Sequence, residues 1–388
     1  MGVKILNNPE STSLSKLKVR LGWGITGQEG IGDRYAYLPR YQAGFDNAQY
    51  QFGSNFQNTL RPNGYDAGIK WEETATLNAA IDFGFYKDRL TGTIEAYQRN
   101  TKDLLNFVPV PAGTNLTNFI TTNVGDLENN GIELSLNATP ILREDQQLDV
   151  GFNIAYNENE ITRLTASDDP TYQGVLTGGI AGGVGSTIQI HSVGFPANAF
   201  FVWEQVYDEA GVPIEGLYVD RNGDGVVNGD DQYRLEKPAP DYSIGFTARY
   251  AFKDFDFSFA GRSNIGNYVY NNVWSDQAFY SRLFNSTGVI SNTNAVVTEI
   301  DFTNPQYFSD HFVRNASFLR VDHVTVGYNS ENLIGKFTRF YITVQNPFVL
   351  SNYEGIDPEV NSDNDRSGVD INIYPRPTTF VFGVNVDF

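Results

Sequence analysis

The chain has 388 residues, 46 acidic and 27 basic, with a formal net charge of −19 and a pI of about 4.5. Such an acidic chain lacks the basic stripe that neutralises phosphates, so nucleic acid is excluded as a partner. It has no cysteine, which also excludes disulfide frameworks and thiolate metal sites. With 22 Tyr, 28 Phe, 37 Gly and one Met, the composition favours an all-β protein with many turns.

The predicted elements are β-strands in which apolar and polar residues alternate, so that each strand has one apolar and one polar face. The first strand is expected at residues 17–26. A tight turn at Lys87-Asp88 then joins strands at 77–86 and 90–99. The same pattern predicts the remaining strands at 132–139, 148–157, 200–207, 244–252, 255–262, 318–328, 339–348 and 380–388.

The connections between these strands alternate in length. Short ones fall near residues 87, 142, 253 and 332, and long ones at 27–63, 105–123, 209–240, 269–315 and 349–375. This alternation is typical of an outer-membrane barrel, which has short periplasmic turns and long external loops. This alternation fails between Ile161 and Phe200, where two long-loop sides would face each other. One more strand is needed to restore it, and we predict this strand at 186–193, followed by a turn at 194–196. The total is then about twelve strands. A helix or an unpaired loop across 187–191 would refute this.

The ends and the hydropathy of the chain add two expectations. No apolar run reaches the roughly 18 residues of a membrane helix, whereas a barrel strand needs only about ten alternating residues. Residues 1–10 contain neither the apolar segment nor the cleavage site of a signal peptide. Since an outer-membrane protein requires one, we expect the chain to lack its natural beginning.

Four motifs carry a family resemblance. Trp71-Glu72, DFGFY at 82–86, YQRNTKDLL at 97–105 and NVGDLENNGIE at 123–133 resemble, in this order, the C-terminal half of the barrel of SusC/RagA-type TonB-dependent outer-membrane transporters. The resemblance covers nearly all of residues 1–388. It implies a partial antiparallel transmembrane β-barrel with long extracellular loops and no plug domain. Its edges belong to a fragment or pair with another chain, because an open edge in lipid leaves backbone groups unsatisfied.

The same resemblance implies a function. The protein would take part in energy-coupled import of an oligosaccharide or peptide across the cell outer membrane, with no enzymatic activity. A SusD-like surface lipoprotein would cover it outside, and TonB would act through the missing N-terminal part. The polar face would line the lumen or contact the plug, and the apolar face would meet lipid. Polar-face candidates are Arg20, Asp82, Glu95, Arg99, Glu133 and Arg249; residues that test the apolar face are Leu134, Phe152, Phe257 and Phe382.

Two other functions stay open at this point. A soluble, secreted, calcium-stabilised β-sandwich binding module would pack its alternating faces sheet on sheet, which would enclose those four apolar residues. A glycosidase would need two carboxylates at a fixed separation. Asp357 and Glu359 are the candidates, in a segment (YEGIDPEV, 353–360) similar to a C-terminal signature of the family. A role in loop folding or partner contact is favoured for them.

One acidic loop has the spacing of a calcium site. Residues 220–231, DRNGDGVVNGDD, fit the pattern D-x-[DN]-x-[DN]-G, which arranges hard oxygen ligands around a tight glycine turn. Because its flanks do not look like paired helices, we expect an EF-hand-like structural Ca²⁺ site. The alternative is an acidic turn cluster that binds nothing. The expected ligands are Asp220, Asn222, Asp224, the Val226 carbonyl, Asn228 and Asp231.

Other motifs favour ordinary structural roles. The glycine cluster at 178–185 lacks the Lys-Ser/Thr ending of a phosphate loop and is predicted to be a flexible loop. His191, His311 and His323 are isolated, so packing or surface roles are expected. Aromatic loop residues such as Tyr35, Tyr37, Tyr41 and Phe200-Phe201 could stack on sugars or contact a partner, with loop packing as the alternative. The final Phe388 resembles the terminal assembly signal of outer-membrane barrels.

Overall fold

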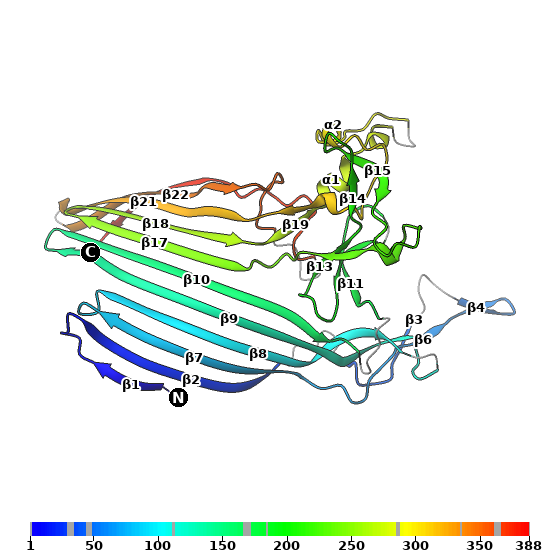
Figure 1. Ribbon diagram of the computed structural model, residues 1–388, viewed down its shortest axis with the longest axis horizontal. Coiled ribbons are helices and arrows are strands. Elements are labelled where there is room, and N and C mark those ends of the chain that lie inside the picture. Colours follow the sequence, from blue (N-terminus) through cyan, green and yellow to red (C-terminus); the bar gives the residue numbers. More distant parts are fainter. Residues whose placement is uncertain are drawn as a thin grey trace.

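The protein divides into a long sheet and a compact group of loops at one end of it (Figure 1). The computed structural model describes residues 2–28, 35–43, 49–110, 113–165, 172–183, 185–284, 288–333, 336–360 and 366–387. The predicted features Phe388 and Val184 of the glycine cluster therefore lie outside the described residues, and so do parts of the long connections predicted at 27–63, 105–123, 269–315 and 349–375.

Eleven antiparallel strands form the sheet, in the order β1-β2-β7-β8-β9-β10-β17-β18-β21-β22-β24. Their bounds are β1 Gly2–Asn7, β2 Leu14–Gln28, β7 Glu72–Phe85, β8 Leu90–Pro109, β9 Phe119–Arg143, β10 Gln146–Arg163, β17 Tyr242–Phe252, β18 Phe255–Ile265, β21 Phe318–Leu333, β22 Lys336–Ser351 and β24 Thr379–Val386. The sheet is open, with β1 and β24 as its two edges. Short turns lie at one end and long loops at the other (Figure 1).

The period-two pattern sets the two faces of this sheet, because residues directly opposite on neighbouring strands point the same way. Phe152 lies opposite Leu136 and Phe246, whereas Asn153 lies opposite Ser135 and Gly245. The apolar side chains form an outward belt that includes Trp23, 72% exposed, and Phe382, 74% exposed. A sheet with such a belt suits contact with lipid.

The four test residues decide against the β-sandwich. Phe152, Phe257 and Phe382 are exposed and Leu134 is half-buried, although a sandwich would enclose all four. The β-sandwich alternative is therefore wrong. In the described part of the chain, no helix combines the length and apolar character needed to cross a membrane.

The loop module, defined here as residues 172–241, 266–317 and 366–370, contains the buried core. Phe200, Tyr270, Phe302 and Phe312 are at most 1% exposed and belong to one apolar cluster. Its strands are β11 Val175–Gly179, β12 Thr187–His191, β13 Ala199–Val202, β14 Gln205–Tyr207, β15 Pro213–Tyr218, β16 Tyr233–Leu235, β19 Tyr268–Asn271, β20 Val313–Asn315 and β23 Val369–Asp370. Its helices are η2 Gly229–Asp231, α1 Asn272–Gln277, η3 Tyr280–Leu283, α2 Val297–Ile300 and η4 Asp310–Phe312.

The strand count and the parity argument need correction. Thr187–His191 is a strand, as predicted, but it pairs with β11 and β13 inside the loop module. The predicted strand at 200–207 also lies there, as β13 and β14. Strand β10 pairs directly with β17. The whole segment between them is therefore one long connection at the loop end of the sheet, and short and long connections alternate without an additional strand in the sheet. With β1 added, the sheet has eleven strands rather than about twelve.

Two small ribbons extend from the loop end of the sheet. Strands β3 (Tyr41–Ala43) and β6 (Leu60–Pro62) pair with each other, and β4 (Gln49–Phe52) pairs with β5 (Asn55–Asn58). Together they form the connection between β2 and β7 (Figure 1).

Candidate functional site

The inner, polar face of the sheet carries shared ion pairs. Arg20 on β2 donates from Nε and Nη2 to both carboxylate oxygens of Asp82 on β7, at 3.0 and 2.9 Å. Its Nη2 also lies 3.4 Å from Glu95 Oε2 on β8. Thr93 Oγ1 donates to Asp82 at 3.0 Å. Three neighbouring strands are thereby linked by one guanidinium, which two-pronged Arg–carboxylate geometry favours.

The strand register places all six predicted polar-face residues on this one face. Glu95 lies directly opposite Glu133, and Arg249 lies opposite Asp149 and Ser258. Arg99 lies over the ring of Tyr97, its Cζ 4.7 Å from the ring centre. The face is therefore polar and charged along its length, whereas the opposite face carries the belt.

The acidic segment at 353–360 lies across this face and is held by arginines. Arg320, 3% exposed, donates to Asp357 at 2.5 Å, and Arg262 donates to Glu359 at 2.8 Å. Arg376 contacts both carboxylates, at 3.4 and 2.9 Å. Each candidate catalytic carboxylate is thus engaged with guanidinium groups, which supports the loop-folding interpretation and not a glycosidase.

In the acidic loop at 220–231, carboxylate side chains accept hydrogen bonds from the loop's own backbone amides. Asp220 accepts from the Gly223 and Gly225 amides at 2.7 and 2.8 Å. The buried Asp231 accepts from three backbone amides, those of residues 221, 222 and 228, at 2.9, 3.2 and 2.8 Å. These amides, Asn228 first, lower the pKa of the Asp231 carboxyl. Positive φ angles at Gly223 and Gly225 explain the two glycines.

The fit of this loop to a cation is partial. Its Asp and Asn oxygens are the hard donors that Ca²⁺ prefers. As placed, however, they accept N–H groups, and across the described residues no three His, Asp or Glu side chains come together as a set that could hold a metal ion. The structure thus accounts for the choice of residues in the loop by its fold alone.

The loop module contains a partly buried polar network that sequence reasoning missed. Asp310 accepts from the Gln205 amide at 3.0 Å and from Tyr233 Oη at 2.8 Å. Burial raises the pKa of Asp310 and, together with Arg314, lowers the pKa of His311 to about 4. His311 Nδ1 lies 3.1 Å from Tyr207 Oη. No local motif could have signalled this network, because its members are about 100 residues apart.

The other predicted residues have structural environments. His191 Nε2 lies 3.0 Å from Asn198 Oδ1 within the loop module, and His323 lies on the inner face beside Arg249. The glycine cluster contributes the end of β11 and a turn in which Ala181 bonds Asn272 through both N–H and C=O, at 2.6 and 3.1 Å. Phe200 and Phe201 are buried in the loop module, which supports loop packing over sugar stacking for them.

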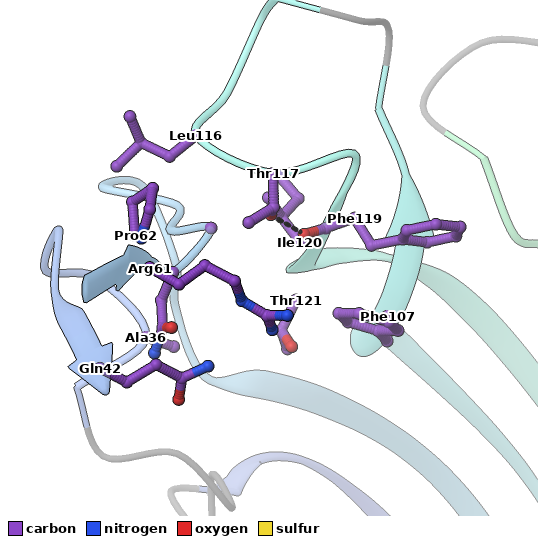
Figure 2. Close-up of a pocket in the computed structure, with 12 residues that line it drawn as sticks. Ala36, Gln42, Arg61, Pro62, Phe107, Leu116, Thr117, Phe119, Ile120 and Thr121 are labelled. Atoms are coloured by element: carbon purple, nitrogen blue, oxygen red, sulfur yellow. Dashed lines mark hydrogen bonds between the residues drawn. The ribbon is translucent and has the colours of Figure 1, made fainter. Parts of the chain in front are cut away.

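A cavity of about 510 Å³ lies where the β2–β7 and β8–β9 connections meet (Figure 2). Gln42 and Arg61 are paired across β3 and β6, and both side chains extend into it. Phe107 and Phe119 stand on the other side with ring centres 5.4 Å apart and planes 20° from parallel. Sequence reasoning named the aromatic residues Tyr35, Tyr37 and Tyr41 nearby but not this pair.

Comparisons with known proteins agree with this architecture. Residues 15–258 match a family described as TonB dependent receptor-like, beta-barrel. The chain is 47% identical over 384 residues to the TonB-dependent receptor SusC of Bacteroides thetaiotaomicron, covering 97% of the chain and 38% of that protein. It is 29% identical to the TonB-dependent receptor P39 of Formosa agariphila, covering 97% and 40%.

Solved structures show the same fold. The RagAB peptide transporter aligns with a TM-score of 0.74 at 23% identity, over 98% of this chain and 42% of that one. Its open-open state aligns with a TM-score of 0.76 at 22% identity. The chain thus spans about two fifths of the length of the relatives it matches.

Proposed function

Since the chain belongs to the family of TonB-dependent receptor-like β-barrels, which are outer-membrane proteins, we propose that it forms the C-terminal part of the barrel of an energy-coupled importer. The cargo is an oligosaccharide or a peptide. The observation that carries the proposal is the division of the sheet into an apolar outer belt and an ion-paired inner face. An antiparallel sheet whose apolar face is exposed and whose other face carries ion pairs suits a wall between lipid and a polar passage.

The two proposed partners act at opposite ends of the sheet. A SusD-like surface lipoprotein covers the loop end, and TonB acts from the periplasm through a part of the protein that precedes this chain. The 47% identity to SusC along almost the whole chain supports this assignment. So does the likeness in fold to RagAB, which is described as a peptide transporter.

In this function the inner face supplies a polar path and the loops supply selectivity. The Arg20, Asp82 and Glu95 group keeps opposite charges paired, so the wall presents hydrogen-bonding groups without an isolated buried charge. The acidic segment at 353–360 fixes the last long loop against the wall near the loop module. The family consists of receptors and transporters, so no catalytic step is assigned.

The test uses the whole transporter in its own outer membrane. Uptake of labelled hexasaccharides and hexapeptides is measured in cells with and without a functional TonB, alongside fractionation of the envelope. We expect the protein in the outer membrane, in a heat-modifiable form, and uptake of one ligand class that stops without TonB. Uptake independent of TonB, or no uptake of either class, would contradict the proposal.

We also propose that Ca²⁺ occupies the loop at 220–231 in the external medium. The support is the set of oxygen donors at Asp220, Asn222, Asp224 and Asn228, already gathered around two glycine turns. Resistance of this loop to limited proteolysis is measured with CaCl₂ or with EDTA. Calcium should protect the loop, Asp224→Asn should abolish protection, and the control Asp230→Asn should retain it. Equal cleavage with and without calcium would refute the site.

A further inference from the structure

An apolar groove crosses the outer face of the sheet near its turn end. It has a volume of about 400 Å³ and runs from β18 over β21 and β22 to the edge strand β24. In the strand register, Phe255 lies opposite Tyr328, and Tyr328 lies opposite Phe340. Val384 ends this row on β24. Because Phe255 is the first residue of β18, the groove lies close to the short turns (Figure 1).

Side chains of two sizes shape the groove. The rings of the first row line its turn side, with the centres of the Phe255 and Tyr328 rings 5.1 Å apart. The next row contains the shorter side chains of Val326 and Ile342, followed by Phe382 on β24. Val326 is 42% exposed and Ile342 is 48% exposed. The two aliphatic residues therefore form the floor of a depression between larger rings.

The floor of the groove is closed toward the inner face of the sheet. Gly383 belongs to the lining, and the ring of Tyr341 packs so closely on its inner side that a Cβ there would collide with the ring. Gly327 also belongs to the lining, and on its inner side lie the Asp256 carboxylate and the Arg339 guanidinium. The groove thus opens outward, on the side that carries the apolar belt.

The position of the groove in the membrane follows from the same two rows. The hydrocarbon band of such barrels is about 25 Å tall and is flanked by aromatic residues at both interfaces, with the short turns on the periplasmic side. Phe255, Tyr328 and Phe340 form a row of rings next to these turns. Val326 and Ile342 come two residues farther from the turns, about 7 Å along the strands. The groove therefore begins at the periplasmic interface and lies on its hydrocarbon side.

A cation lies beside the groove at this interface. The exposed Lys253 has its Nζ 5.4 Å from the centre of the Phe252 ring, and Phe252 lies opposite Phe255 on the outer face. The ammonium group is therefore on the lipid side of the turn. A long basic side chain at such a position keeps its charge at the level of the lipid headgroups, where the complementary group is a phosphate. Groove and charge together fit a phosphate joined to an alkyl chain.

We propose that the groove is a binding site for one phospholipid of the periplasmic leaflet, with an acyl chain in the groove and the headgroup phosphate beside Lys253. A chain in the groove has protein atoms beneath and beside it, so it gains more dispersion contacts than a chain on a flat part of the belt. This lipid exchanges more slowly than the other lipids around the barrel. The site requires a lipid-facing belt and is independent of what the barrel imports.

The test uses the intact transporter in vesicles that contain a small fraction of a phosphatidylethanolamine with a diazirine in one acyl chain. Illumination attaches the lipid to nearby residues, and mass spectrometry of peptides locates the attachment points. We expect them to concentrate at 326–328, 340–342 and 382–384. The reference is Ile94, which is 47% exposed on the belt and close in exposure to Ile342. Equal labelling at Ile94 and Ile342 would overturn the site.

A substitution that fills the groove tests its shape. Ile342→Trp places a large side chain on the floor, at a surface where lipid can move aside. Labelling at 326–328 and 382–384 should then fall to the level at Ile94, whereas the matched control Ile94→Trp should leave it unchanged. Both variants should keep heat-modifiable migration. Labelling of the groove that persists in Ile342→Trp would overturn the proposal.

The phosphate contact is tested with a second probe, a diacylglycerol that carries the same diazirine chain and no phosphate. Lys253→Gln should lower labelling of the groove by the phospholipid about fivefold, the usual effect of one lysine at an anionic lipid surface. It should leave labelling by the diacylglycerol unchanged. The control Lys87→Gln, at the turn between β7 and β8, should affect neither probe. Equal labelling by both probes, unaltered by Lys253→Gln, would overturn the phosphate contact.

A protein could cover the groove in place of lipid, and a second copy of the chain is the case that is tested. Ile342→Cys is oxidised in vesicles and separated without reductant. We expect a monomer, because lipid keeps the groove of each copy apart. A disulfide-linked dimer would assign the groove to contact between copies and would overturn the lipid site, while TonB-dependent uptake would leave the transport function standing.

Discussion

The sheet and the loop module both contain large aromatic and aliphatic side chains but place them in opposite environments. In the sheet, Trp23 and Phe382 point outward and stay exposed. In the loop module, Phe200, Phe302 and Phe312 form a closed core. Large apolar side chains therefore face outward in the sheet and are enclosed in the loop module. The fraction exposed alone does not identify the environment.

Polar groups differ between the regions as well. On the inner face of the sheet, charges are paired between neighbouring strands, as for Arg20 and Asp82. In the loop module, the half-buried Asp310 accepts hydrogen bonds from uncharged groups, the Gln205 backbone N–H and Tyr233 Oη. The two regions are joined by the segment at 353–360, whose Asp357 meets Arg320 of the sheet and whose Tyr353 donates to Asp370 of the loop module at 2.7 Å.

The largest effect is expected from a cavity in the enclosed core. Phe302→Ala should lower the free energy of unfolding of the loop module by about 3–5 kcal/mol, because the surrounding side chains cannot close the space. Amide hydrogen exchange of residues 297–316 measures this. Phe152→Ala in the belt should cost much less, since lipid fills the space. Equal losses would mean that the two regions are packed alike.

Next in size is the junction between the regions. Asp357→Asn removes the carboxylate nearest the buried Arg320 guanidinium and should cost about 3 kcal/mol, as loss of one partner of a buried pair does. Denaturant unfolding in vesicles reports the change. Glu354→Gln on the same segment breaks only an exposed pair with Arg314 and should cost less than about 1 kcal/mol. If Glu354→Gln costs as much, the buried junction is not what holds the segment.

A charge placed in the belt distinguishes lipid from water. Ile81 on β7 and Ile214 on β15 are 44% and 38% exposed. Ile81→Arg should destabilise the protein in lipid by about 2–3 kcal/mol, since arginine is costly on the lipid face of a barrel. Ile214→Arg should change stability by less than about 0.5 kcal/mol. Urea titration in vesicles provides both values, and a neutral Ile81→Arg would contradict a lipid-facing belt.

The smallest effect concerns pH and the loop module. The pKa of His311 falls to about 4 in the folded protein, so below pH about 6.5 the unfolded chain binds a proton that the folded chain does not. With respect to His311, the loop module therefore has its full stability above pH 6.5. It loses about 1–2 kcal/mol of that stability, allowing for solvent screening, as the pH falls toward 4. The raised pKa of Asp310 acts in the opposite direction and offsets part of the loss.

Hydrogen exchange of the loop module between pH 7 and pH 4 checks this. His311→Asn should flatten the response, whereas His191→Asn should leave it in place. A response that persists in His311→Asn would assign the titration to another group.

The sequence predicts the sheet well because lipid and water impose a period of two on residues such as those at 148–157 and 244–252. It fails at 200–207, where all four residues of β13 are buried and no face is polar. It also misses β1, a short strand whose identity depends on pairing with β2. Alternation identifies a strand, but it does not determine which sheet the strand joins.

The same distinction applies to the site. The turns of the loop at 220–231 are encoded locally, because Asp220 and Asp231 accept hydrogen bonds from backbone amides close by in the sequence; its calcium site stays a prediction. The arginine partners of Asp357 come from positions 262, 320 and 376, and the cavity joins Arg61 to Phe107. Such groupings depend on which loops and strands meet, and no local pattern encodes that.

The central claim is that adjacent residues of one strand face lipid and water in turn. The chain has no cysteine, so single spin labels can be placed through Phe152→Cys and Asn153→Cys in the intact protein in vesicles. Collision rates with oxygen and with a water-soluble nickel chelate are then compared, with Leu217→Cys as an exposed loop reference. We predict oxygen-dominated collisions at 152 and nickel-dominated collisions at 153 and 217. Nickel-dominated collisions at 152, or shielding of 152 from both reagents, would contradict the claim.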